Sequence, residues 1–267
     1  MLLVCLGIAL TALAVVVVVL ALSGGSTDRS AGSKAKRGLE ATRHCRAGEI
    51  RLGSRRVSFA AFVRTSVGVY RHPNGVLLTT LPRLRKSFVR TNRSGVPTVV
   101  AALAEVRMSD CQARWYRIEL PRRSGVTSTE DGYIRAAAIE LAKVRTRVVV
   151  DLSQRKLTLF EDGVPVLRAP AAVGASSTPT PRGRFIVRER IRITDSAGAY
   201  GAAAIALSAY SKKLSYWPEG GPVAIHGTND PGSIGKAVSH GCVRLAARDL
   251  KRLFARVQLG TPVEIVC

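Results

Sequence analysis

The sequence predicts a mainly β protein: a small barrel followed by a second β-rich region that contains one helix. Short apolar runs separated by turn residues recur through residues 44–143, a spacing typical of a small barrel. Similar runs continue through residues 144–267. A helical apolar stripe occurs once, near the C-terminus, between residues 246 and 257.

The N-terminal 23 residues predict a membrane anchor or a signal peptide. Residues 2–22 form an uncharged apolar run long enough to span a bilayer. Ala21-Leu22-Ser23 also offers a small-x-small site for cleavage of a secretory signal. Residues 24–43 then predict a basic flexible linker. Because the basic residues follow the apolar run, the positive-inside rule alone would place the C-terminal side in the cytoplasm.

The charge balance is strongly basic, with 41 Lys and Arg against 18 Asp and Glu, a formal net charge of +23. Nucleic acid is the usual partner of such a chain. The N-terminal segment argues against nucleic acid, so we expect anionic wall polymers and lipid headgroups to be attracted instead. The simplest alternative is an arginine-rich surface with no specific partner.

In the first β-rich region, we expect strands at residues 67–70, 76–78, 98–103, 115–120 and 132–135. The stretch W-Y-R-I-E-L-P, followed by G-Y-I-R, is similar to bacterial SH3-like domains. This resemblance implies an SH3-like domain over residues 44–143 that binds wall peptide or positions an enzyme. Cys45 and Cys111 both lie there and would form a disulfide in an oxidising compartment. The alternative is two unrelated buried thiols.

The second region predicts a series of strands and then the helix. The expected strands are residues 147–151, 156–161, 164–168, 185–193, 203–209, 222–226 and 263–266. Residues 185–193 alternate apolar side chains with arginine, which predicts a half-exposed strand with a cationic face. In the helix, Leu250, Leu253, Phe254 and Val257 form one apolar stripe.

Candidate catalytic residues gather between residues 225 and 245. His226, His240 and Cys242 lie here, and a histidine beside a thiol can take its proton and return it to a leaving amine. Gly241 would let the backbone approach a ligand and present N–H groups to an oxyanion. A zinc site and an inert buried thiol are the alternatives. The absence of a Cys-x-x-Cys or His-x-x-x-His pair in the sequence disfavours zinc.

These residues carry a family resemblance. H-G-T, a loop and then S-H-G-C-V-R-L resembles the signature of the L,D-transpeptidases, the YkuD-domain family. Residues 148–160 resemble the family's first hairpin, and residues 173–183 resemble its V-G…T-P-x-G segment. The resemblance covers residues 144–267 and implies a β-sandwich-like catalytic domain with a minor helix. It implies neither a metal nor a cofactor.

The resemblance also implies roles for individual residues. Cys242 would be the nucleophile and His226 the proton acceptor and donor, oriented by a backbone carbonyl because the next residue is glycine. His240 would act by position or charge, and N–H groups around Gly241 would form the oxyanion hole. The residues expected to bind substrate are Arg244, Ser239, Tyr200, Gly201, Gly227 and Thr228.

The implied reaction is a 3→3 cross-link between peptidoglycan stem peptides, a donor tetrapeptide and an acceptor amine, through a cysteine thioester. Two alternatives stay open: an L,D-carboxypeptidase that hydrolyses the same thioester, and a wall-binding protein with a decayed site. Each implies an extracytoplasmic protein at the cell wall, either secreted or anchored in the membrane by residues 1–23.

Overall fold

The computed structural model describes residues 47–88, 94–120, 131–211, 213 and 221–267. The expected signal or anchor at residues 1–23 and the linker at residues 24–43 lie outside these residues. Cys45 does too, so its disulfide with Cys111 stays a prediction. No helix within the described residues is both long enough and apolar enough to cross a membrane.

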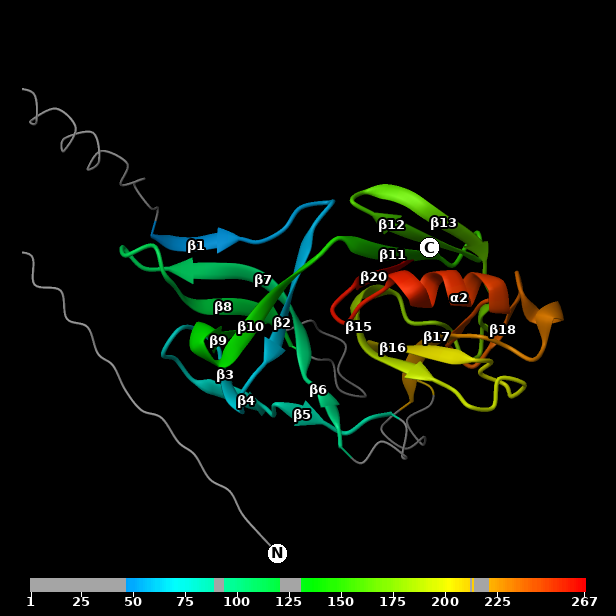
Figure 1. Ribbon diagram of the computed structural model, residues 1–267, viewed down its shortest axis with the longest axis horizontal. Coiled ribbons are helices and arrows are strands. Elements are labelled where there is room, and N and C mark those ends of the chain that lie inside the picture. The colour runs from blue at the N-terminus through cyan, green and yellow to red at the C-terminus, as the bar shows by residue number, and fades with distance from the viewer. Residues whose placement is uncertain (1–46, 89–93, 121–130, 212, 214–220) are drawn as a thin grey trace, which may run out of the picture. The chain divides into compact units, whose positions relative to one another are not determined.

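The first region is an antiparallel sheet of eight strands in the order β10-β2-β7-β8-β9-β3-β4, with β1 also paired to β7 (Figure 1). The strands are β1 (Gly48–Arg51), β2 (Ser58–Val63), β3 (Val67–Tyr70), β4 (Leu77–Leu81), β7 (Val99–Arg107), β8 (Ala113–Glu119), β9 (Asp131–Arg135) and β10 (Ile139–Val144). Beside this sheet, β5 (Leu84–Arg85) pairs with β6 (Val96–Pro97). The five expected strands all have a counterpart here. The SH3-like assignment stays a prediction.

The second region is built on another eight-stranded sheet, in the order β13-β12-β11-β20-β15-β16-β17-β19. Its strands are β11 (Thr146–Asp151), β12 (Lys156–Glu161), β13 (Val164–Pro170), β15 (Gly183–Arg192), β16 (Ala203–Tyr210), β17 (Pro222–His226), β19 (Val243–Arg244) and β20 (Pro262–Val266). The strands β14 (Val173–Gly174) and β18 (Ala237–Ser239) pair in parallel and form a separate two-stranded sheet. The mainly β class is therefore confirmed.

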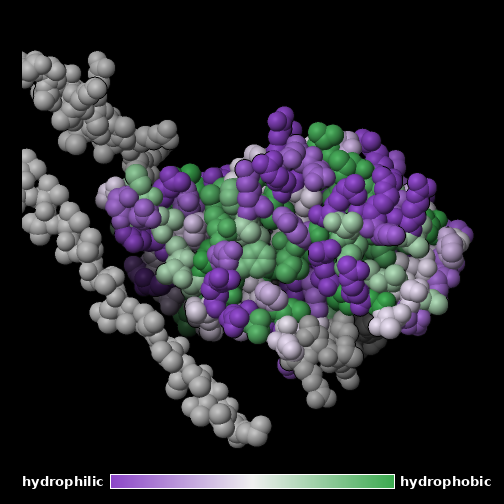
Figure 2. All heavy atoms as spheres, viewed as in Figure 1, coloured by the Kyte–Doolittle hydropathy of each residue, from purple (hydrophilic) through white to green (hydrophobic). Residues whose placement is uncertain are grey.

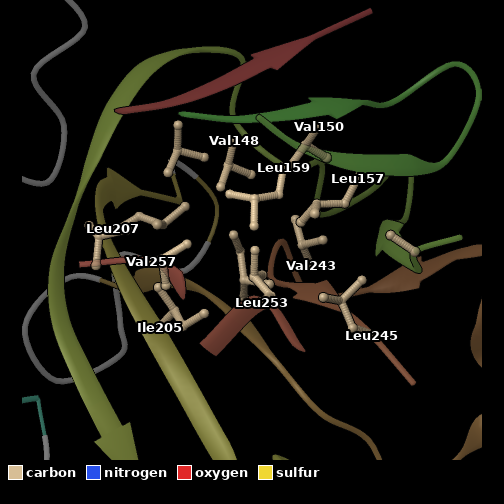
Figure 3. Close-up of a cluster of buried hydrophobic side chains, with 14 of the residues drawn as sticks. Val148, Val150, Leu157, Leu159, Ile205, Leu207, Val243, Leu245, Leu253 and Val257 are labelled. Carbon is tan, nitrogen blue, oxygen red and sulfur yellow. The ribbon is translucent and has the colours of Figure 1, made fainter. Parts of the chain in front are cut away.

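The helix α2 (Ala247–Arg256) closes the core of the second region. Its expected apolar stripe is confirmed, because Leu250, Leu253 and Phe254 are all buried. Figure 3 shows Leu253 and Val257 facing side chains from β11 and β12 and from β16. Strands far apart in the sheet order thus share one core with the helix. Each fully buried Leu, Val or Ile contributes about 1.5–3 kcal/mol relative to exposure.

Strand β15 departs in part from the predicted alternation of buried and exposed side chains. A register shift between Val187 and Glu189 breaks the two-residue period. Phe185, Ile186 and Val187 are consecutive and all buried, with Ile186 in a small cluster that also contains Ala60, Val99 and Val144. The predicted cationic face is present at Arg190 and Arg192, which are exposed, but at Ile186 both faces of β15 are covered, one of them by the first region.

Past the bulge, Glu189 is buried and links the two regions by polar contacts. Its carboxylate accepts hydrogen bonds from the Ser87 hydroxyl and, at 3.1 Å, from the Phe88 N–H. The Arg85 guanidinium lies 3.6 Å from the same carboxylate and donates to the Arg188 carbonyl at 2.6 Å. Burial lowers the Arg85 pKa to about 10. Figure 2 shows hydrophilic residues over much of the visible surface, with hydrophobic patches between them.

Candidate active site

The site is built on the parallel pair of β17 and β19, where Ile225 lies opposite Val243 and His226 opposite Arg244. Successive side chains of a strand point to opposite faces. Ile225 and Val243 are fully buried in the core, and Figure 3 shows Val243 among the core side chains. His226 and Arg244 therefore share the other face. Cys242, two residues before Arg244, falls on that face as well.

The Cys242 thiol faces β17. The N–H of Ala224 lies 3.4 Å from the sulfur and donates a hydrogen bond to it, which places Sγ over the strand that ends in His226. Burial raises the pKa of the thiol, while the Ala224 hydrogen bond and the charge of Arg244 act against that shift. The net direction is upward, so the free protein holds Cys242 as a neutral thiol at neutral pH.

His226 is 4% exposed, and its orientation is fixed by the backbone. Its Nδ1 lies 2.6 Å from the Gly227 carbonyl oxygen. A carbonyl can only accept, so Nδ1 carries the proton and Nε2 is left as the base. This confirms the expected backbone orienter. Burial, opposed by this hydrogen bond, lowers the His226 pKa to about 4, so the ring is neutral at neutral pH.

The Tyr200 ring packs on His226 with their centroids 4.8 Å apart. Two glycines make this approach possible: Gly227 N–H donates to the Tyr200 carbonyl at 2.8 Å, and a Cβ on Gly201 would lie 2.9 Å from the Gly227 Cα. Gly201 and Gly227 are both buried. Their packing favours a role in bringing the two segments around Tyr200 and His226 together over the expected contact with substrate. Tyr200 is 45% exposed and stays available to a ligand.

A tight turn at residues 239–242, the nucleophile turn, presents Cys242. Ser239 is 1% exposed, and its hydroxyl donates to the Cys242 carbonyl at 2.5 Å and accepts from the Gly241 N–H at 3.1 Å. Ser239 therefore closes the turn, whereas the sequence suggested that it binds substrate. Gly241 has φ of 114°, a conformation that side chains oppose. Because its N–H is engaged by Ser239, the N–H groups of His240 and Cys242 are the better oxyanion donors.

The other two predicted residues lie at the edge of the site. His240 is exposed on the nucleophile turn. The Thr228 hydroxyl donates to the Asp230 carbonyl at 3.3 Å and accepts from the Asp230 N–H at 3.0 Å. Thr228 thus shapes its own loop.

Within the described residues, no cluster of three or more His, Cys, Asp or Glu side chains could hold a metal.

Sequence reasoning missed the segment that supports the nucleophile turn from behind. The Thr178 hydroxyl and the Ala175 N–H both donate to the Ser239 carbonyl, at 2.9 and 2.8 Å. Ala172 exchanges two backbone hydrogen bonds with Arg244, each 2.9 Å long. The T-P-T-P pattern at residues 178–181 marked this segment as part of a family motif, but no local signal tied it to Cys242.

Arg244 is half-buried and lies opposite His226, two residues after Cys242. Its Nε is buried and has no hydrogen-bond partner among the described residues. Burial raises the pKa values of Cys242 and Tyr200 and lowers that of His226, and the charge of Arg244 acts in the downward direction on all three. A guanidinium placed in this way can donate hydrogen bonds to the carboxylate of a ligand.

Comparison with known proteins gives a consistent match for the second region. Residues 145–265 match the model of the YkuD family, described as the L,D-transpeptidase catalytic domain. The protein named L,D-transpeptidase YkuD in Bacillus licheniformis is 42% identical over 119 residues, which cover 45% of this chain. Its Bacillus subtilis counterpart is 38% identical over 118 residues, 44% of this chain. The matched part spans 64% of the length of each Bacillus protein.

Among solved structures, the catalytic domain of an Enterococcus faecium L,D-transpeptidase, acylated by ertapenem, is 26% identical. The matched part covers 45% of this chain and 95% of the Enterococcus faecium domain, with a TM-score of 0.35. An L,D-transpeptidase from Mycobacterium smegmatis is 20% identical, covering 63% of this chain and 90% of its own, with a TM-score of 0.38.

Proposed function

We propose that residues 145–265, which match the model of the YkuD family, form an L,D-transpeptidase catalytic domain, and that this protein joins peptidoglycan stem peptides through a thioester on Cys242. The observation that carries the proposal is the shared face of β17 and β19. Its register puts His226, Arg244 and Cys242 on one side, away from the core. A nucleophile, a base with a fixed tautomer and a cation for a substrate carboxylate would then share one face of the strand pair.

The first half-reaction follows from the two neutral groups. As the Cys242 sulfur attacks the carbonyl carbon of the third stem residue, its proton passes to Nε2 of His226. The N–H groups of His240 and Cys242 would stabilise the oxyanion, each at about 2.7–4 kcal/mol. The imidazolium then gives its proton to the leaving amine of D-Ala. The carbon–nitrogen bond breaks and the thioester is left.

The second half-reaction reverses these roles. The amine of a second stem peptide attacks the thioester, and its proton passes to Nε2 of His226. The thiolate leaves, takes that proton back and returns as the Cys242 thiol, so no net charge accumulates. Water in place of the amine would give a carboxypeptidase, and a site unable to form the thioester would be only a wall-binding module.

The place of action follows from the substrate. Peptidoglycan stem peptides are cross-linked outside the cytoplasmic membrane, so we propose that the catalytic region is extracytoplasmic. Residues 1–23 would deliver it there as a signal peptide or anchor. The first region would be an SH3-like module that positions the enzyme on the wall, a proposal supported by its small antiparallel sheet. A cross-link of this kind requires no cofactor, metal or nucleic acid.

Product analysis tests the proposal. Purified protein would be incubated with disaccharide-tetrapeptide, and the products identified by liquid chromatography and mass spectrometry. We expect a cross-linked dimer lacking one D-Ala, no product with Cys242→Ala, and unchanged product with Cys267→Ala, which removes an exposed cysteine elsewhere. Tripeptide as the sole product would indicate a carboxypeptidase. A dimer still formed by Cys242→Ala would exclude the thioester.

A further inference from the structure

A large cavity lies away from Cys242, between the first region and strands β15 and β20. Its volume is about 1240 Å³, above the 300–1,000 Å³ usual for a small-molecule site. Its walls come from the segment between β1 and β2, from β7 and from the starts of β11 and β15. We call it the arginine cleft, after Arg51, Arg55, Arg56 and Arg184, which line it.

These four arginines are exposed, and none forms an ion pair with another described residue. The cleft is also lined by three acidic residues, two of which are neutralised by arginines of the same walls. Asp131 pairs with Arg117 at 2.6 Å, and Glu264 lies 3.3 Å from Arg147. The third, Glu119, faces the cavity too. The free charge of the cleft is therefore positive.

The chemistry of the walls narrows the ligand. Arginine binds phosphate and carboxylate oxygens through paired N–H groups, and a concave surface of one charge concentrates the opposite charge. Single-stranded nucleic acid would also need exposed aromatic rings for its bases to stack on. The aromatic side chains of this cavity are half-buried Phe59 and buried Phe185, so stacking is disfavoured. A polymer without bases fits better.

We propose that the arginine cleft binds a segment of a linear polyanion with repeated phosphate or carboxylate groups. The position of the cleft connects it with the active site through one short stretch of chain. Thr178 holds the nucleophile turn, Thr180 follows two residues later, and Arg184 is in the cleft. The four residue-to-residue steps from Thr180 to Arg184 span at most about 14 Å. A polymer held there would keep the catalytic centre at the wall.

The test compares two variants of the full chain with equal net charge. One replaces the four cleft arginines with glutamine, Arg51→Gln, Arg55→Gln, Arg56→Gln and Arg184→Gln. The control replaces four exposed arginines outside the cleft: Arg71→Gln, Arg83→Gln, Arg168→Gln and Arg248→Gln. Circular dichroism would check that both fold. Fluorescence anisotropy would measure binding of polyphosphate and of poly-γ-glutamate, and so separate the phosphate source from the carboxylate source.

We expect the cleft variant to bind the preferred polymer about 30- to 1000-fold more weakly at 150 mM NaCl, with the control within about threefold of wild type. The slope of log affinity against log salt should fall by about three in the cleft variant alone. Equal losses in both variants would show that binding follows net charge and would overturn the proposal. So would no binding to either polymer, or tighter cleft-dependent binding of oligothymidine.

Discussion

The catalytic centre and the arginine cleft place their polar groups in opposite surroundings. His226 is buried and Cys242 is half-buried, and each is hydrogen-bonded to a backbone group. Burial shifts both pKa values in the direction that favours the neutral form. The arginines of the cleft are exposed to water. One centre depends on short-range geometry and the other on a long-range field. Salt should therefore weaken polymer binding while leaving the chemical step at Cys242 almost unchanged.

This difference also explains why the two centres tolerate mutation differently. A buried polar group has one partner in one geometry, so its loss leaves a neighbour unsatisfied. An exposed arginine acts together with its neighbours, so the loss of one is partly covered by the rest. We expect single substitutions to disable the catalytic centre, and only combined substitutions to disable the cleft.

The largest effect should come from the base. His226→Ala should slow acylation of Cys242 by a carbapenem about 10²–10⁴-fold, because the neutral thiol then has nowhere to send its proton. Whole-protein mass spectrometry over time would measure the rate of adduct formation. His240→Ala is the matched control, since His240 is exposed on the nucleophile turn, and it should slow the reaction less. A larger loss in His240→Ala would exchange the two roles.

Burial of His226 also predicts a dependence of stability on pH. Its pKa is about 4 in the folded protein against 6.5 when exposed, so between these values only the unfolded chain takes up the proton. Stability from this residue is complete above about pH 6.5 and falls as pH drops to 4, by about 3 kcal/mol. Urea unfolding at pH 7 and pH 4 would measure it.

His226→Gln is the control for this titration, because glutamine can still donate to the Gly227 carbonyl but takes up no proton. The fall in free energy of unfolding between the two pH values should be about 3 kcal/mol smaller in this variant than in the wild type. Identical falls would show that His226 is protonated at a higher pH than its burial implies.

The sequence predicted local elements well and the contacts between distant elements poorly. The strand ending at His226 and the helical stripe of α2 each follow from short patterns. The contact of Ala224 with the Cys242 sulfur does not, because it depends on the parallel pairing of β17 and β19 across a long loop. No pattern within either strand encodes that register.

The same limit explains why the sequence does not say how three of the predicted site residues act. A family motif marks Ser239, Gly201 and Gly227 as important without saying whether they contact a ligand or another part of the chain. In the structure all three are buried and make backbone contacts that shape the site. The bulge in β15 was missed for a related reason, because the first region covers a face that the strand pattern alone leaves exposed.

The smallest expected effect concerns Arg244. It tests whether Arg244 acts through a fixed bidentate geometry, like the groups of the catalytic centre, or through its charge alone, like the arginines of the cleft. Its Nε is buried and has no hydrogen-bond partner among the described residues. A bidentate contact with a stem-peptide carboxylate should contribute about 1.5–3 kcal/mol. Lysine keeps the charge but loses the fork. Arg244→Lys should therefore lower kcat/KM for the tetrapeptide donor about as much as Arg244→Ala, roughly 10- to 150-fold.

Steady-state kinetics with wild type and both variants, with folding checked by circular dichroism, would decide the matter. If Arg244→Lys retains full activity and Arg244→Ala does not, Arg244 acts as a point charge, like the arginines of the cleft, and added salt should then reduce the wild-type rate. If both variants stay within about twofold of wild type, less than about 0.5 kcal/mol, the substrate carboxylate is held elsewhere. Tyr200, which is exposed and packs against His226 with its ring tilted by 59°, is then the next position to test.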